Sequence, residues 1–213
     1  MESAAPQVPS FAAFDIVAIA ASLGGINALG RVLSALPPDF PVPVAVVQHV
    51  SASSSGVVPK ILSRSCALPV AHAQANEPLC PGRVYVAPPD QHFFINRAGR
   101  ASLLRGPRVK FTRPAADPLL VSAALCYGAR TLGVVLTGAS TDGAGGVQAI
   151  KWAGGMVLAQ DQWSSQAFAM PRAAIATGCV DMVLPIDVMG QAIVALTMVR
   201  GAAEFLRVPL HAA

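Results

Sequence analysis

Short runs of β-branched residues alternate along this chain with longer stretches rich in alanine and leucine, and this rhythm restricts the possible folds most strongly. Such alternation is typical of βαβ units, in which each helix returns the chain to the start of the next parallel strand. The runs predict strands at residues 15–20, 42–48, 83–87, 131–136, 156–160 and 180–184. They predict helices at residues 25–35, 57–65, 118–127, 143–153, 171–177 and 187–203. We therefore expect an α/β fold with an open, doubly wound and mostly parallel sheet.

One segment departs from the rhythm. Residues 83–105 contain short apolar runs around a polar Arg-Ala-Gly-Arg turn, which predicts an antiparallel hairpin at one edge of the sheet. The length of 213 residues is ordinary for one domain. The sequence thus predicts a Rossmann-like, three-layer single domain over residues 14–204, preceded by a loose tail at residues 1–13.

The composition fits a sheet that is buried on both faces, because 54% of the residues are hydrophobic and only 12% are charged. No apolar stretch reaches the roughly 18 uninterrupted residues of a membrane span. The first residues lack the basic segment and apolar run of a targeting peptide. We expect a soluble, cytoplasmic protein without membrane insertion. The four cysteines form no C-x-x-C pair, so free thiols are expected.

The net charge is +4, and residues 105–113 are the only place where basic side chains concentrate. As a nucleic-acid footprint this segment is weak, because Phe111 is the only aromatic residue among its basic side chains. A solvated loop or an acidic protein partner explains the segment equally well. We therefore predict no nucleic-acid partner.

A serine follows the first predicted strand directly. Ser22 and the next residues, Leu23 and Gly24, form a sharp turn before a predicted helix, where free N–H groups and the helix dipole could stabilise an oxyanion. An N-cap serine is the simpler alternative. A dinucleotide site is a minor one, because the G-x-G-x-x-G spacing is absent and the next strand ends in Gln48 and His49 rather than in an acidic residue.

Polar residues also follow two further predicted strands. His49 ends the second strand, and adjacent parallel strands lie about 4.8 Å apart, so it could reach Ser22. Asp142 follows a glycine-rich loop after the strand at residues 131–136. A structural histidine and an N-cap aspartate are the alternatives for these two residues. Together the three supply a nucleophile, a base and a carboxylate that orients the base.

The order Ser22, His49, Asp142 matches neither the α/β-hydrolases nor the chymotrypsin-like proteases, and no G-x-S-x-G elbow is present. A triad formed by these residues would therefore be an independent instance of the same geometry on a doubly wound sheet.

Four segments carry a family resemblance. They read IVAIAASLGGINALGRVLSALPPDFPVPVAVVQH, PGRVYVAPPDQH, VVLTGASTDGAGGVQAIKWAGG and LAQDQWSSQAFAMPRAAIATGCVD. In order and spacing, from about Phe14 to Leu184, they resemble the catalytic domain of the chemotaxis protein-glutamate methylesterases, the CheB family. The resemblance implies hydrolysis of glutamate γ-methyl esters on chemoreceptor helices with release of methanol, and in many members deamidation of receptor glutamines.

Carried over by motif, Ser22 resembles the nucleophile, His49 the general base and acid, and Asp142 its orienting carboxylate. No organic cofactor and no metal is implied. The expected partner is the methylated helical region of a chemoreceptor-like protein. Backbone N–H groups after Ser22 and in the loop at residues 137–140 are the oxyanion candidates.

Several pocket positions matter for these expectations. Leu23 and Gly24 follow the serine, Ala139 and Ser140 lie in the glycine-rich loop, and His92 and Met170 match family positions near the cleft. Leu23 replaces a residue with a hydroxyl, Ala139 removes a bulky wall, and Ser140 stands where the family has glycine. These changes leave the triad intact but alter the walls around it.

Many members of the family carry an N-terminal receiver domain that covers the active site until it is phosphorylated. Only about 13 residues precede the first predicted strand here, so we expect a stand-alone catalytic domain that is constitutive or is regulated by a separate receiver protein. Two alternatives remain beside the esterase. The fold could be a weakened binding or signalling module, or the enzyme could hydrolyse a small-molecule ester.

Overall fold

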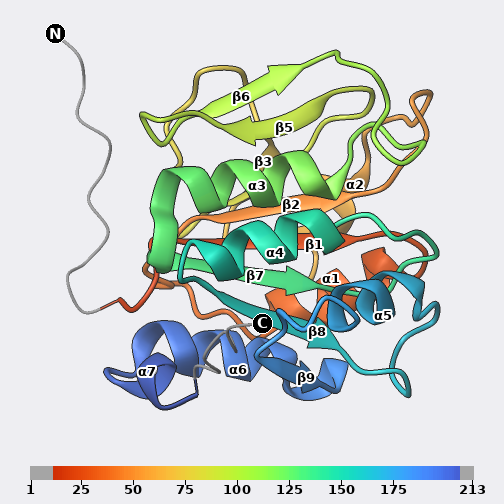
Figure 1. Cartoon of the computed structure of the whole chain (residues 1–213). Coiled ribbons are helices and arrows are strands. Elements are labelled where there is room, and N and C mark those ends of the chain that lie inside the picture. The colour runs from red at the N-terminus through yellow and green to blue at the C-terminus, as the bar shows by residue number, and fades with distance from the viewer. Residues whose placement is uncertain (1–11, 207–213) are drawn as a thin grey trace, which may run out of the picture.

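The computed structural model describes residues 12–206 and shows a doubly wound α/β domain. The predicted tail at residues 1–13 lies almost wholly outside the described residues. Seven strands form a parallel sheet in the order β3-β4-β2-β1-β7-β8-β9, with β1 at its centre (Figure 1). These strands are β1 (Ile16–Ala21), β2 (Val44–Gln48), β3 (Val70–His72), β4 (Val84–Val86), β7 (Thr131–Val135), β8 (Met156–Gln160) and β9 (Met182–Leu184).

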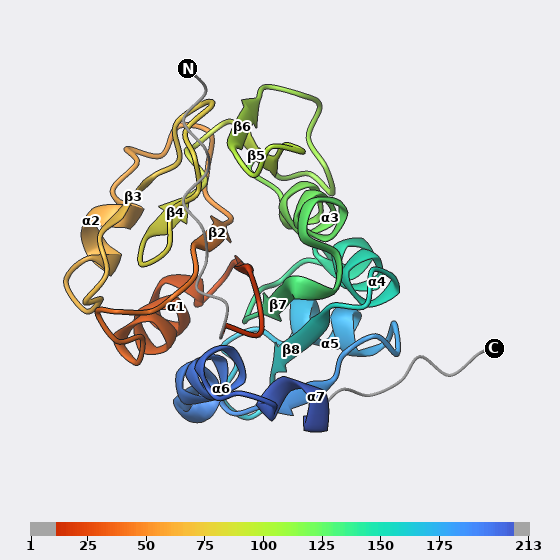
Figure 2. The same cartoon turned by 90° about the vertical axis from the view of Figure 1, so that its left-hand side faces the viewer.

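Helices cover both faces of the sheet (Figure 2). One layer contains α1 (Gly25–Ser34), α2 (Val58–Leu62) and α6 (Ile186–Met198). The other contains α3 (Ala116–Tyr127), α4 (Ala144–Trp152) and α5 (Ala169–Ile175). All residues of β1, β2, β7 and β8 are buried, which explains how a chain with so few charges folds into one domain.

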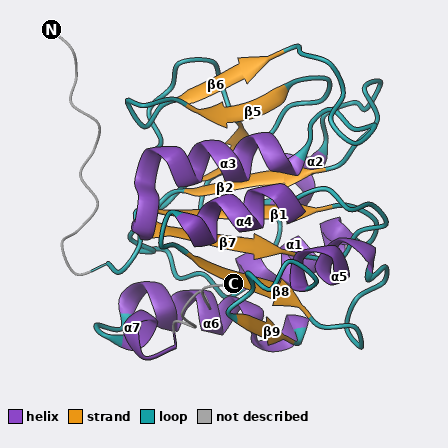
Figure 3. Cartoon of the chain, viewed as in Figure 1, coloured by secondary structure: helices purple, strands orange, loops and turns teal. Residues whose placement is uncertain are grey.

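The predicted hairpin is present as a two-stranded sheet of its own. β5 (His92–Ile95) and β6 (Ala101–Leu104) pair in antiparallel register and lie over α3 rather than joining the large sheet (Figure 3). Ile95 N–H donates to Ser122 Oγ of α3 at 2.9 Å, which fixes the hairpin to that helix.

The structure differs locally from the predicted elements. The short strand β3 was missed, because its three partly exposed residues carry no clear apolar run. The helix predicted at residues 118–127 begins at Ala116 instead. The long helix predicted at residues 187–203 is two helices, α6 and α7 (Ala202–Leu206), separated near Gly201, whose φ of 82° ends a helical turn.

The topology fixes where a site can form. The chain builds β1, adds β2 beside it, places β3 at the edge and β4 between β3 and β2, and then returns to add β7 on the other side of β1. The carboxyl ends of β1, β2 and β7 therefore surround the switch point, which is where ligands bind in open α/β sheets. Within residues 12–206 no helix is both long and apolar enough to cross a bilayer, and the four cysteines are free.

Candidate active site

Ser22 and His49 leave the sheet side by side. β1 and β2 pair in parallel with Ala21 opposite Gln48. The N–H of His49 donates to the carbonyl of Ala21 at 2.9 Å, which carries the pairing one residue beyond the strands. The structure thus brings together two of the predicted site residues through backbone pairing alone.

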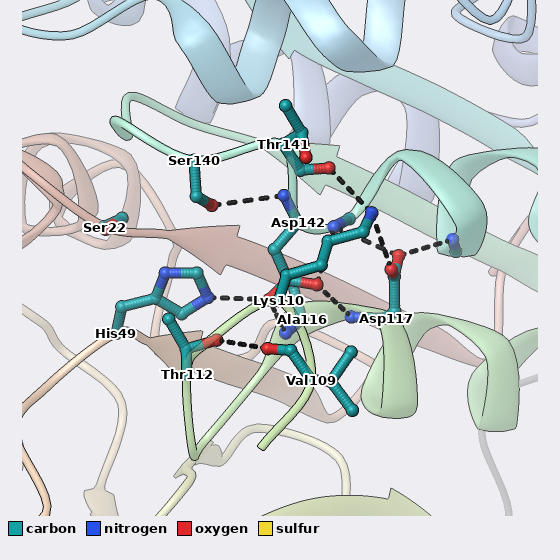
Figure 4. A network of polar contacts seen from close by, with 12 residues as sticks. Ser22, His49, Val109, Lys110, Thr112, Ala116, Asp117, Ser140, Thr141 and Asp142 are labelled. Atoms are coloured by element: carbon teal, nitrogen blue, oxygen red, sulfur yellow. Dashed lines mark hydrogen bonds and ion pairs between the residues drawn. The ribbon is translucent and has the colours of Figure 1, made fainter.

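Asp142 joins His49 from the third strand end (Figure 4). Its side chain is completely buried, and Oδ2 accepts hydrogen bonds from His49 Nε2 at 2.8 Å and from Ala116 N–H at 2.5 Å. Oδ1 accepts from the N–H groups of Asp117 at 3.1 Å and of Gly143 at 3.0 Å. The carboxylate therefore has four donors, as an anion buried at a helix N-terminus requires.

These donors decide the charge of Asp142. Burial by itself raises the pKa of a carboxyl group, but the hydrogen bonds from His49 and Ala116 outweigh it and hold the pKa of Asp142 below its usual value. An ionised Asp142 can only accept a hydrogen bond, so the hydrogen of the imidazole is on Nε2 of His49 and Nδ1 keeps its lone pair. The histidine is thereby prepared to accept a proton at Nδ1.

The simpler N-cap interpretations of Ser22 and Asp142 are wrong. The N-cap residues of α1 and α4 are Gly24 and Gly143, with φ of 78° and 96°, and neither helix has a side-chain cap. Both glycines adopt the left-handed region that other residues rarely enter. Ser22 lies two residues before the N-cap of its helix, and most of the donors to Asp142 lie outside α4.

A second carboxylate, which the sequence analysis missed, mirrors Asp142. Asp117 lies in the first turn of α3, and its Oδ1 accepts the N–H groups of Gly143 at 3.0 Å and Gly146 at 2.8 Å at the start of α4. Asp142 in turn binds the first N–H groups of α3. Each helix start is therefore bound by a carboxylate from the neighbouring segment, α3 by Asp142 and α4 by Asp117. An acidic residue in the first turn of a helix was the available signal.

The backbone of Ser22 is held firmly, whereas its hydroxyl is not. Ser22 N–H donates to Thr137 O at 2.9 Å, and its carbonyl accepts from Gly25 N–H and from Gln48 Nε2, both at 2.8 Å. Gln48 Nε2 also donates to the carbonyl of His49 at 3.0 Å, so this buried amide ties the two strand ends together. Ser22 Oγ makes no hydrogen bond with any residue between 12 and 206, which leaves it free to rotate toward a substrate.

An open depression of about 400 Å³ lies directly over the serine. Its lining comprises Ser22, Leu23, Gly24, Gly25, Ile26, Asn27, Gln48 and His49. Leu23 is 52% exposed at its rim. Among residues 12–206 no group of three or more His, Cys, Asp or Glu side chains could hold a metal ion.

The loop after β7 closes the site from the other side. A Cβ at Gly138 would lie 2.8 Å from Ser22 Cβ and 2.1 Å from Met170 Sδ, so only glycine fits between them. Met170 is buried and supports this contact instead of lining the depression. Ala139 is exposed. Ser140 has an ordinary φ, so glycine is not needed there, and its Oγ accepts the N–H of Asp142 at 3.1 Å.

His92 lies apart from the depression. It is buried in β5, where Nε2 donates to Pro107 O at 2.9 Å and the ring meets Phe94 edge to face. The histidine therefore anchors the loop that follows β6.

Comparison with known proteins identifies the family. The sequence model of the CheB methylesterase family matches residues 17–193. A protein-glutamate methylesterase/protein-glutamine glutaminase of Anaeromyxobacter dehalogenans is 46% identical over 183 residues, 86% of this chain and 53% of the relative. One of the same name from Pyrococcus horikoshii is 38% identical over 203 residues, 93% of this chain and 55% of the relative. The chain thus spans about half the length of these relatives.

A solved structure resembles the whole fold. The crystal structure of the Thermotoga maritima CheB methylesterase catalytic domain superposes with a TM-score of 0.83 at 33% sequence identity, covering 86% of this chain and 98% of that one. With the family match over most of the sequence, this likeness settles the classification. The chain belongs to the CheB methylesterase family.

Proposed function

We propose that this protein is a serine esterase that hydrolyses glutamate γ-methyl esters on a chemoreceptor-like protein and releases methanol. The observation that carries the proposal is the 2.8 Å contact between His49 Nε2 and the buried Asp142 carboxylate, beside a serine at the adjacent strand end. A base oriented by an ionised carboxylate next to a hydroxyl is the arrangement that nucleophilic ester hydrolysis needs. The relatives named as methylesterases support the choice of ester.

The reaction follows from the hydrogen-bonding groups. Ser22 Oγ attacks the ester carbonyl while its proton passes to Nδ1 of His49, and the ionised Asp142 stabilises the imidazolium. The tetrahedral intermediate collapses as His49 returns the proton to the departing methoxide, which leaves as methanol. Water activated by His49 then hydrolyses the glutamyl ester on Ser22, which restores the serine and frees the glutamate carboxylate.

Backbone N–H groups around the serine are proposed to hold the oxyanion. Those of Leu23, Gly24 and Ala139 donate to no residue between 12 and 206. Leu23 and Gly24 precede α1, so the positive end of that helix adds to their effect. Removing a single such donor typically lowers kcat by about a hundredfold or more.

The same site would deamidate glutamine. An amide differs from the ester only in its leaving group, and His49 would protonate nitrogen so that ammonia departs in place of methanol. The relatives whose names include protein-glutamine glutaminase support this second reaction.

The test is methanol release from a methylated chemoreceptor fragment, with Ser22→Ala as the matched inactive variant. We expect turnover by the wild type and a loss of about a millionfold for Ser22→Ala, as when the serine of other triads is removed. Equal rates for the two proteins would exclude the serine mechanism.

Covalent labelling separates the esterase from a binding module. A fluorophosphonate probe should label the wild type at Ser22 and leave Ser22→Ala unlabelled, whereas a module without catalysis would leave both unlabelled. Faster turnover of p-nitrophenyl esters than of the methylated fragment would instead favour a small-molecule ester as substrate. The open depression of about 400 Å³ above Ser22 is the feature that makes this comparison informative.

A further inference from the structure

An apolar groove runs along the outer face of α3, outside the depression above Ser22. It encloses about 320 Å³. Its lining is formed mainly by Phe94, Val109, Pro118, Val121 and Leu125. Leu125 is 82% exposed although it is large and apolar. Pro118, Val121 and Leu125 are spaced so that they lie on one face of α3, and the groove therefore follows this helix away from its N-terminus.

The groove begins at the catalytic network. Asp117, whose carboxylate holds the start of α4, is also part of the groove lining. The α3 N–H groups at its near end bind Asp142. A molecule lying in the groove would therefore end beside the carboxylate that orients His49.

A strained turn follows Val109, a residue of the groove lining, and lies beside the polar network of the triad (Figure 4). Val109 and Thr112 exchange backbone hydrogen bonds of 3.1 and 2.9 Å, and between them Lys110 and Phe111 adopt φ of 47° and 68°. A bulky residue such as phenylalanine rarely takes this conformation, which costs about 1–3 kcal/mol. Phe111 nevertheless is 93% exposed and gains no burial in return.

Lys110 holds this turn in place. Its Nζ donates to Thr141 O at 2.9 Å and pairs with Asp117 Oδ2 at 3.0 Å. Thr141 immediately precedes Asp142, so the turn is fastened to the same network as the triad. Strain that the surrounding structure maintains at such a place indicates a function for the residue it presents.

Positive charge surrounds the turn. Arg105, Arg108, Lys110 and Arg113 lie within one short segment, and the carboxylates that pair with them are Asp90 and Asp117. Arg108 is exposed and makes no hydrogen bond or ion pair with any residue between 12 and 206. This segment, which contributes Val109 to the groove, therefore carries more positive than negative charge and forms a basic rim at that end, which favours an acidic occupant.

We propose that the groove along α3 and the turn at residues 109–112 form a docking site for an acidic, amphipathic helix of the protein substrate. The inference rests on the proposed function and identifies the surface that binds the protein substrate. A helix seats its apolar face in such a groove, Phe111 packs against it as an aromatic anchor, and the basic rim pairs with glutamates beside the ester. Continuity of the groove with the Asp142 network directs one end of the helix toward the triad.

The experiment compares two substrates in each variant. The probes are a methylated chemoreceptor cytoplasmic fragment and p-nitrophenyl acetate, and the readout is the ratio of their kcat/KM values. Phe111→Ala, Leu125→Ser and Arg108→Glu change the groove and its rim. Matched controls are Phe205→Ala, on a residue 92% exposed in α7 at the opposite end of the sheet (Figure 1), and Arg64→Glu, after α2 on the other face.

We expect each groove variant to lower the ratio about tenfold, the size typical of losing an interface anchor, through KM for the fragment. The controls should leave the ratio at the wild-type value. Equal ratios in all variants would overturn the docking site while leaving the esterase intact. Hydrolysis of p-nitrophenyl acetate with none of the fragment would refute the proposed substrate and the docking site together, and hydrolysis of neither would refute the esterase itself.

The strained turn offers a second, independent readout. Phe111→Gly removes the conformational penalty, because glycine readily adopts a positive φ. We expect an unchanged or higher Tm together with the same tenfold loss in the ratio. A lower Tm with an unchanged ratio would show that Phe111 serves stability instead of docking.

Discussion

The two sides of the triad are built in opposite ways. On one side the Asp142 carboxylate is completely buried and accepts four hydrogen bonds from His49 and from two helix N-termini. On the other side Ser22 lies under an open depression, its backbone fixed and its hydroxyl without a partner among residues 12–206. The Asp142 side is therefore rigid and orients His49, whereas the Ser22 side is open to the substrate.

The buried side needs fixed geometry, whereas the open side needs freedom to move. A carboxylate that must fix a histidine tautomer cannot be allowed to rotate, and the ring of hydrogen bonds prevents it. A nucleophile that must approach different carbonyls gains from freedom about one torsion angle, since catalytic hydrogen bonds often tighten only when the substrate arrives. Substitutions on the two sides should accordingly differ in size.

The largest effect on the rigid side is expected from Asp142→Asn. An amide cannot stabilise the imidazolium and can present its NH₂ group to the ring, which favours the wrong tautomer. We expect kcat for p-nitrophenyl acetate to fall about ten-thousandfold, as in the type case. A loss below about tenfold would show that Asp142 does not orient His49.

Asp117→Ala should have a smaller effect that reaches the triad through Asp142. Without this carboxylate the first N–H groups of α4 lose their acceptor, and Gly143, which also binds Asp142, is free to shift. We expect kcat to fall about tenfold to a hundredfold, the cost of a small misplacement.

Two control variants test whether the effect of Asp117→Ala is specific to this carboxylate. Asp117→Asn keeps an oxygen acceptor and should recover part of the rate. Asp187→Ala removes an exposed aspartate from the first turn of α6, outside the lining of the depression above Ser22, and should leave kcat unchanged. If Asp187→Ala slows the enzyme as much as Asp117→Ala, a general loss of helix stability explains both.

The buried Asp142 carboxylate should also make the folded protein less stable at acidic pH. Because the pKa of Asp142 is lower in the folded chain than its ordinary value near 4, its stabilising effect is complete above that value and is lost as the pH falls further. Urea unfolding at pH 7 and pH 3 should show a larger loss of unfolding free energy for the wild type than for Asp142→Asn. Equal losses would contradict this assignment.

The smallest effect is expected on the open side. Leu23→Thr places a hydroxyl at the rim of the depression, where one hydrogen bond contributes about 0.5–1.5 kcal/mol. We expect kcat to change by about tenfold at most. A change approaching that of Asp142→Asn would mean that the open side is as precisely constructed as the buried one.

The sequence predicted the sheet because its strands are continuous apolar runs that need no tertiary context. It predicted the side-by-side placement of Ser22 and His49 for a related reason, since consecutive parallel strands end at one edge. The strand β3 lacked such a run and was missed.

Asp117 and Lys110 could not be placed in the same way. Apart from the ion pair between them, their partners lie in the segment around Asp142, 25 or more residues along the chain, and only tertiary packing brings them together. Met170 packs against Gly138 and Ser140 accepts the N–H of Asp142, and spacing alone does not distinguish these supporting positions from the walls of a pocket.

The central position of β1 has a consequence for folding. Ser22 and His49 can meet as soon as β1 and β2 pair, but Asp142 is 93 residues beyond His49 and arrives only when β7 docks on the other side of β1. Closing so long a loop is among the slower steps in forming a sheet. During refolding, esterase activity should therefore appear only when β7 has paired with β1. Activity is then a measure of the completely folded sheet.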